Sequence, residues 1–158
     1  MNLGLQGSIR RESVINNRKY IARIFYQTID AIGAGQAEVA AFDQVAADTF
    51  QAHLPGGPTV DREGFKGVVQ AFGVGFPGAT HTIEEILADE KVVAIRITWR
   101  GKHTGVFQGA PATHKDIEMS EMGMMRIEGG KVVEFWPLFD SMNLMMGTGI
   151  VKLSAPEQ

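Results

Sequence analysis

The chain has 158 residues, of which 15 are lysine or arginine and 18 are aspartate or glutamate, giving a formal net charge of −3. Because these charges are scattered along the sequence, they do not favour nucleic acid or an acidic membrane surface as a partner. The length fits one domain with a substantial core. We therefore expect a single domain over residues 1–158, with frayed ends at 1–10 and 152–158.

The absence of cysteine excludes disulfides and thiolate metal sites, and it agrees with a reducing cytosol. The N-terminus lacks the uninterrupted apolar run of a signal peptide, and no apolar stretch reaches the ~20 residues that cross a bilayer. We therefore expect a cytoplasmic protein that has no membrane partner.

Three helices are predicted in the first half of the chain, each from apolar residues at helical spacing. The first runs from an N-cap at Ser13 to a stop at Gly33. The second is short and covers residues 37–47. The third begins after the N-cap Asp61 and ends before the turn at residues 76–78.

In the second half the pattern changes to the alternation that is typical of strands. Apolar and polar residues alternate from Val93 to Trp99, and a preceding strand is expected around residues 80–87. Two further strands flank the dipeptide Gly129–Gly130 as a hairpin. Helices followed by an antiparallel meander indicate the α+β fold class.

Three carboxylates lie at strand spacing around the Gly-Gly turn. A two-residue type I′ loop pairs Glu128 with Lys131, and continuing this register puts Glu121, Glu134 and Asp140 on one face. Glu121 would then lie diagonally from Asp140, within about 7–8 Å. The sequence therefore predicts an acidic patch on one sheet surface, unless a bulge at the proline of the second strand changes the parity of Asp140.

Several spaced motifs resemble one known family. They are AHLPGG at 52–57, REGFKGVVQAF at 62–72, the segment 75–113 that begins GFPGATHTIEEIL, and RIEGGKVVEFW at 126–136 with an aspartate four residues after the tryptophan. In this order they resemble the SnoaL-like polyketide cyclase family of the NTF2-like superfamily. The resemblance extends over nearly the whole chain, from about residue 13 to residue 147.

The resemblance implies an NTF2-like cone, in which N-terminal helices pack on a strongly curved, mainly antiparallel β-sheet and enclose a pocket. It also implies a homodimer formed through the outer sheet face, and chemistry without a cofactor. In the cyclases an aspartate near the chain end is the general base and acid of an intramolecular aldol condensation. Asp140 matches that position, and His53 and His103 match the family's histidines.

The predicted catalytic residues are therefore Asp140, His53, His103 and Glu121. Burial among apolar neighbours can raise the pKa of a carboxyl group by several units, which would make Asp140 a better base for a carbon-bound proton. The alternative is that Asp140 is the N-cap of a short helix at 141–146. Spacing alone slightly favours the cap, whereas the resemblance favours a catalytic role.

The expected ligand is a small, hydrophobic, oxygenated molecule that is polyketide-like or terpenoid-like. Eight methionines, most of them in the predicted sheet and the C-terminal segment, suit a pocket for such a molecule. Either Phe25 or Tyr26 could face this pocket from the first helix. The predicted pocket residues are Tyr26, Phe72, Phe76, Trp99, Met122, Met124, Trp136 and Phe139.

Acid-base cyclisation or isomerisation is the first functional hypothesis, and two others remain open. Epoxide hydrolysis on the same scaffold needs an arginine between two acids, yet the register puts Arg126 on the face opposite Glu121. A non-catalytic small-molecule-binding domain is the third hypothesis. His81 and His114 are predicted to be solvated, and the spacing of the four histidines predicts no metal site.

Overall fold

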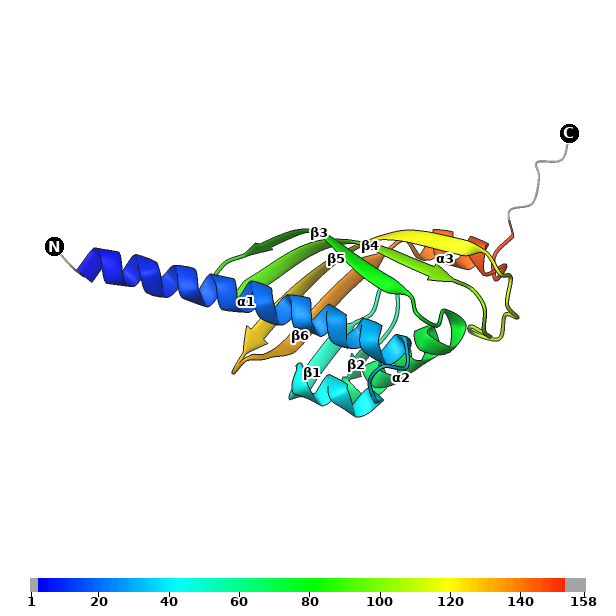
Figure 1. The fold of residues 1–158 in the computed structure, drawn as a ribbon, viewed down its shortest axis with the longest axis horizontal. Helices are drawn as coiled ribbons and strands as arrows, with labels where there is room; N and C mark the ends of the chain where they lie inside the picture. Colours follow the sequence, from blue (N-terminus) through cyan, green and yellow to red (C-terminus); the bar gives the residue numbers. More distant parts are fainter. Residues whose placement is uncertain (1–2, 153–158) are drawn as a thin grey trace, which may run out of the picture.

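The computed structural model describes residues 3–152, in which one long helix crosses a curved six-stranded sheet (Figure 1). The helices are α1 (Leu3–Gly33), the 3-10 helix η1 (Val39–Gln44), α2 (Arg62–Gly75) and α3 (Ser141–Gly147). The strands are β1 (Ala46–His53), β2 (Thr59–Asp61), β3 (Thr80–Ala88), β4 (Val92–Lys102), β5 (Asp116–Glu128) and β6 (Lys131–Phe139). The α+β class predicted from the sequence is confirmed.

The predicted helices differ from the observed ones mainly at their ends. The first begins at Leu3 rather than Ser13, so it includes most of the segment 1–10 that was expected to be frayed; residues 1–2 and 153–158 lie outside the described part. The second is only the 3-10 helix η1. The third starts where predicted, because the Asp61 carboxylate accepts the Gly64 backbone N–H at 2.8 Å. No helix among residues 3–152 is long and apolar enough to cross a membrane.

The sheet has the strand order β2-β1-β6-β5-β4-β3. β1 pairs with β6 in parallel, and the other four pairings are antiparallel, as expected of a mainly antiparallel sheet. β1 and β2 were not predicted from the sequence. β1 is rich in alanine, which has a low strand propensity, and it owes its conformation to pairing with β6 and β2.

The hairpin of β5 and β6 begins in the predicted register and then leaves it. Gly129 and Gly130 have φ of 56° and 79°, which suits a type I′ turn, and Glu128 pairs with Lys131. A bulge then inserts one extra residue in β6, so that Glu121 pairs with Phe139. Since a shift of one residue exchanges the two faces of a strand, the predicted acidic patch is wrong.

The inner face of the sheet carries the core. Along β5 buried and exposed residues alternate without interruption, and the buried apolar side chains belong to the two core clusters that the sheet forms with the helices. One cluster gathers phenylalanines from η1, β1, α2 and β6 around Phe25, with Phe42, Phe50, Phe65 and Phe135 within 6.3 Å between ring centroids. A second cluster, around Phe76 and Trp99, lies at the end of the sheet near α3. A cavity opens between these two clusters.

Candidate active site

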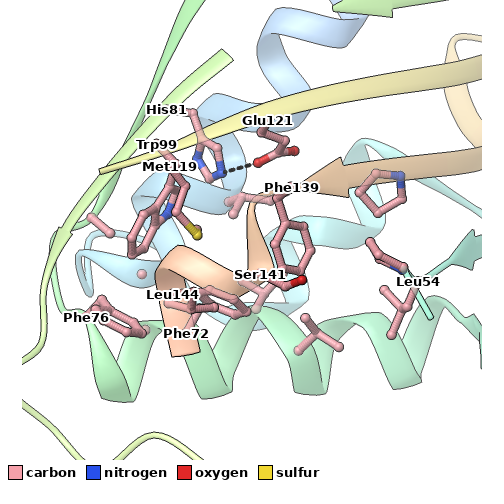
Figure 2. A pocket seen from close by; sticks show the side chains of 18 of the residues that line it. Leu54, Phe72, Phe76, His81, Trp99, Met119, Glu121, Phe139, Ser141 and Leu144 are labelled. Atoms are coloured by element: carbon pink, nitrogen blue, oxygen red, sulfur yellow. Dashed lines mark ion pairs between the residues drawn. The ribbon is translucent and has the colours of Figure 1, made fainter. Parts of the chain in front are cut away.

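The cavity lies between α1, α2 and the inner face of the sheet, and it has a volume of about 340 Å³. Most of its wall is apolar and aromatic, formed by residues that include Phe65, Phe72, Phe76, Trp99, Phe107, Phe135 and Phe139. Figure 2 shows Glu121 and His81 on one side of it and Phe72, Phe76 and Leu144 on another. An apolar pocket with a few convergent polar groups is the usual form of a small-molecule site.

Four polar side chains form a connected chain along one wall of this pocket. The Tyr26 hydroxyl donates to Glu121 Oε1 at 2.9 Å, and Glu121 Oε2 lies 3.7 Å from His81 Nε2. On the other side of the imidazole, His81 Nδ1 lies 2.5 Å from Asp30 Oδ1. Asp30 Oδ2 also accepts the His81 backbone N–H at 3.0 Å. Asp30, His81, Glu121 and Tyr26 are called the acid-base group below.

Each member of the acid-base group comes from a regular element. Tyr26 and Asp30 are four residues apart on α1 and therefore share one face of the helix. His81 is the second residue of β3, and Glu121 occupies an inward position of β5. At Gly123, two residues further along β5, an added Cβ would lie 2.9 Å from the Tyr26 hydroxyl oxygen. The glycine therefore provides the space in which Tyr26 reaches Glu121.

Burial dominates the electrostatics of the Tyr26–Glu121 pair, whose residues are 2% and 7% exposed. Loss of solvent raises the pKa of Glu121 above its ordinary value; His81 and the hydrogen bond from Tyr26 act against this, and Asp30 adds to it. Burial also raises the pKa of Tyr26 well above its ordinary value, and the neighbouring Glu121 raises it further. Both side chains therefore hold their protons more strongly than they would in water.

Asp140 lies outside the pocket. Its side chain is exposed and caps α3, because one carboxylate oxygen accepts the Asn143 backbone N–H at 3.0 Å. The bulge in β6 explains the difference from the predicted position, since it turns Glu134, Trp136 and Leu138 to the outer face. The neighbouring Ser141 does line the pocket. Of the predicted catalytic residues, only Glu121 belongs to the lining.

His53 lies on the outer face of the sheet. Its ring stacks on Trp136 with 5.1 Å between centroids and 7° between planes. Its Nδ1 lies 3.0 Å from the Thr59 hydroxyl oxygen, and its Nε2 lies 2.9 Å from Glu134 Oε1. Glu134 also forms an ion pair with Arg126, its partner across β5 and β6. In this arrangement His53 connects β1, β2 and β6 and does not reach the pocket.

His103 is completely buried but is not part of the pocket wall. Its Nδ1 accepts the Thr113 backbone N–H at 3.2 Å, and the Thr113 hydroxyl donates to the Gly147 carbonyl at 3.0 Å. Its Nε2 has no hydrogen-bond partner among the described residues. The ring packs against Phe76 at 5.1 Å. His103 thus joins the two ends of the loop between β4 and β5, and Thr113 connects this loop to the end of α3.

The predicted pocket residues divide between the two faces of the sheet. Tyr26, Phe72, Phe76, Trp99 and Phe139 line the pocket, and Phe25 belongs to the core beside it. Met122, Met124 and Trp136 instead lie on the outer face. The methionines alternate with the inward residues of β5, and Trp136 is turned outward by the bulge in β6.

Two members of the acid-base group, His81 and Asp30, are not among the residues predicted for the site. His81 was predicted to be solvated, yet its side chain is only 11% exposed and lines the pocket; that prediction is wrong. Asp30 was not considered. The signals were present: Asp30 lies one helical turn after Tyr26, and His81 shares strand parity with the apolar Ile83. Neither signal, however, is specific enough to identify a site residue from one sequence.

The arrangement does not suit two other kinds of site. Within residues 3–152 no three His, Asp or Glu side chains converge to hold a metal ion. Asp30 and Glu121 approach opposite nitrogens of the His81 ring, which explains why these three do not share a metal position. The described residues lining the pocket include no arginine, the residue that epoxide hydrolysis would need between two acids.

Comparisons with known proteins agree with this fold. The sequence model of the SnoaL-like polyketide cyclase family matches residues 24–147. IdmH of Streptomyces antibioticus, provisionally described as a polyketide cyclase, is 28% identical with a TM-score of 0.67, covering 80% of this chain and 97% of IdmH. No curated protein matches the chain.

Two more distant structures share the fold. A protein of Jannaschia sp. CCS1, provisionally described as a SnoaL-like polyketide cyclase, is 14% identical with a TM-score of 0.78, covering 88% of this chain and 96% of its own. AclR of Streptomyces galilaeus, provisionally described as a hydroxylase, is 20% identical with a TM-score of 0.74, covering 90% of this chain and 87% of its own.

Proposed function

The chain belongs to the SnoaL-like polyketide cyclase family, and we propose that it is an enzyme that moves protons on a hydrophobic, oxygenated small molecule. The reaction is an intramolecular aldol ring closure or a related isomerisation, driven by side chains without a cofactor. The observation that supports this most directly is the acid-base group on the wall of an apolar pocket.

In this proposal His81 is the base. Because a carboxylate only accepts hydrogen bonds, Asp30 holds the hydrogen of the imidazole on Nδ1 and leaves the lone pair on Nε2. Nε2 takes the proton from a carbon next to a carbonyl group, and the enolate so formed attacks a second carbonyl carbon of the same molecule. One carbon–carbon bond forms, and the second carbonyl oxygen becomes an alkoxide.

Glu121 is the acid. Its raised pKa favours the protonated form, which can give its proton to the alkoxide. The proton on His81 Nε2 then passes to Glu121 Oε2, 3.7 Å away, after a small side-chain movement or through a water molecule. The group returns to its starting state, and no proton is gained or lost. General acid-base catalysis of this kind contributes roughly 10²–10⁴-fold to a rate.

The test measures proton transfer on a simple ketone. Hydrogen–deuterium exchange at the activated methylene of 2-tetralone, a bicyclic apolar ketone, is followed by NMR with the whole protein. We expect the protein to accelerate exchange, and His81→Ala and Glu121→Gln each to lose most of the acceleration. Asp140→Asn is the matched control, because asparagine keeps the N-cap of α3.

Binding of 2-tetralone without accelerated exchange would contradict the catalytic proposal and favour a ligand-binding domain. Loss of exchange in Asp140→Asn, with His81→Ala unaffected, would return the catalytic role to Asp140.

We also propose that the protein is a homodimer. The outer sheet face carries a contiguous apolar patch in which Met122 pairs with Leu138 and Met124 pairs with Trp136 across β5 and β6. Three of these side chains are 48–64% exposed. These four residues are called the outer patch. Clustered exposed apolar side chains mark interaction sites, and a second copy of the same sheet offers a complementary surface.

A further inference from the structure

The loop between β4 and β5 contributes one aromatic side chain to the pocket. Within residues 103–115, Phe107 is only 2% exposed, whereas its neighbour Val106 is 59% exposed. The other aromatic residues of the wall lie on helices or strands, apart from Phe76, which directly follows α2. Of the aromatic residues in the pocket wall, Phe107 therefore lies farthest along the chain from a helix or strand.

A tight turn fixes the position of Phe107. Phe107 and Ala110 exchange two backbone hydrogen bonds of 3.0 and 2.8 Å, and the two residues between them, Gln108 and Gly109, have φ of 48° and 81°. Both values lie in the left-handed region, as a type I′ turn requires. Gln108 also lines the pocket, while its residue as a whole remains exposed.

The end of α2 provides a socket for the Phe107 side chain. A Cβ added to Gly75 would lie 2.8 Å from the Phe107 Cβ and 3.0 Å from one of its ring carbons, so only glycine fits there. The Gly75 carbonyl also accepts the backbone N–H groups of Thr104 and Gly105, each at 3.1 Å. The base of the loop is thus held against α2, and the ring has a fixed place.

The ring closes the pocket on the side away from the acid-base group. Phe107 packs on Phe72 at 4.9 Å and on Phe76 at 5.1 Å between centroids. Figure 2 places Phe72 and Phe76 across the pocket from Glu121 and His81. A ligand whose oxygen lies at Glu121 therefore extends its apolar body toward the wall that Phe107 completes.

From these contacts we infer that Phe107 is a specificity-determining residue, which sets the longest apolar ligand that the pocket admits. The inference rests on the proposed function in that it assumes the ligand enters this pocket with its oxygen near Glu121. It concerns ligand size alone and does not depend on whether any proton is transferred. Removing the ring leaves a space continuous with the pocket, which one more aromatic ring of a ligand can occupy.

The test compares two fluorescent phenols, 2-naphthol with two fused rings and 1-hydroxypyrene with four, and measures the Kd of each by titration. For Phe107→Ala we expect the preference for 1-hydroxypyrene over 2-naphthol to rise by about tenfold or more, as differences of a few carbons do in apolar pockets. Val106→Ala is the control in the same loop and should keep the wild-type ratio. Phe107→Leu replaces the alanine variant if circular dichroism shows that Phe107→Ala is unfolded.

Binding of both phenols with an unchanged ratio in the folded Phe107 variant would overturn the inference and leave the proposed function intact. If neither phenol binds the wild-type protein, the assumption of an apolar ligand pocket fails, and both the inference and the proposed function are rejected. If the ratio rises in the Phe107 variant while 2-tetralone exchange is absent, the size limit is confirmed and only the catalytic proposal falls.

Discussion

Tyr26 and Glu121 share a 2.9 Å hydrogen bond at a depth where both residues are almost fully shielded from solvent. The phenol is the donor, so one oxygen of the carboxyl group is satisfied while the other faces His81. This bond fixes the rotamer of Glu121 and therefore the direction in which it can exchange a proton. The pair links the stability of the fold to the chemistry that we propose.

Tyr26→Phe removes the donor without changing the shape of the core. We expect the variant to lose about 1–3 kcal/mol of unfolding free energy, because a buried carboxyl oxygen loses its partner. The pKa of Glu121 should rise further, since the hydrogen bond from Tyr26 lowers it. Urea denaturation measures the first effect, and the pH dependence of 2-tetralone exchange measures the second. An unchanged pH profile would show that the hydroxyl does not influence Glu121.

Glu121→Gln should make the protein more stable at neutral pH, and the gain should depend on pH. The folded-state pKa of Glu121 is raised, so the folded state holds this proton more strongly than the unfolded chain does. The wild type therefore has its full stability below the ordinary pKa of glutamate, 4.5, and loses stability as pH rises through the folded-state pKa.

Melting temperatures of the wild type and Glu121→Gln should therefore be close at pH 4 and diverge toward pH 8. Glu128→Gln, at the exposed end of the same strand, controls for the loss of one carboxylate. The same divergence in both variants would contradict burial as the cause.

The sequence predicted the framework better than the site. Alternating apolar residues, the Asp61 cap and the two glycines of the hairpin are local signals, and each formed the predicted element. The bulge in β6 has no local signal, and it reverses the face of every later residue up to Asp140. The contact of Asp30 with His81 joins residues 51 positions apart. Such a pairing depends on how α1 crosses the sheet, which no spacing in the sequence encodes.

Gly123→Ala tests whether the glycine keeps space for Tyr26. The added methyl group would meet the Tyr26 hydroxyl oxygen at 2.9 Å and a ring carbon of Phe135 at 3.1 Å. Overpacking of this kind costs typically about 1–3 kcal/mol, and exchange activity should fall with it. Gly67→Ala is the matched control, because nothing lies within 4 Å of its added Cβ in α2. That variant should gain about 0.5–1 kcal/mol from higher helix propensity. Equal losses in both variants would show that Gly123 has no special packing role.

Asp30→Asn tests the orientation of His81. The amide is nearly isosteric with the carboxylate, but it can present an N–H to Nδ1 and so favour the wrong tautomer of the imidazole. We expect the maximal exchange rate to fall roughly 10²–10⁴-fold, with little change in the affinity for 2-tetralone. Single-turnover exchange at saturating ketone separates the two quantities. A loss confined to affinity would make Asp30 a binding residue instead.

Leu138→Lys tests the proposed dimer through the outer patch. Leu138 is 64% exposed beside Met122, so a lysine there is solvated in the monomer and costs the fold little. In a dimer that buries this patch, two-fold symmetry adds two such charges to one apolar interface, and each would lose its solvation. Light scattering after size exclusion should therefore show a dimer for the wild type and a monomer for the variant. Val74→Lys is the control, because Val74 is 63% exposed on α2, away from the outer face. A dimer that persists in Leu138→Lys would place the contact between copies elsewhere. Monomeric wild-type protein would contradict the proposed dimer.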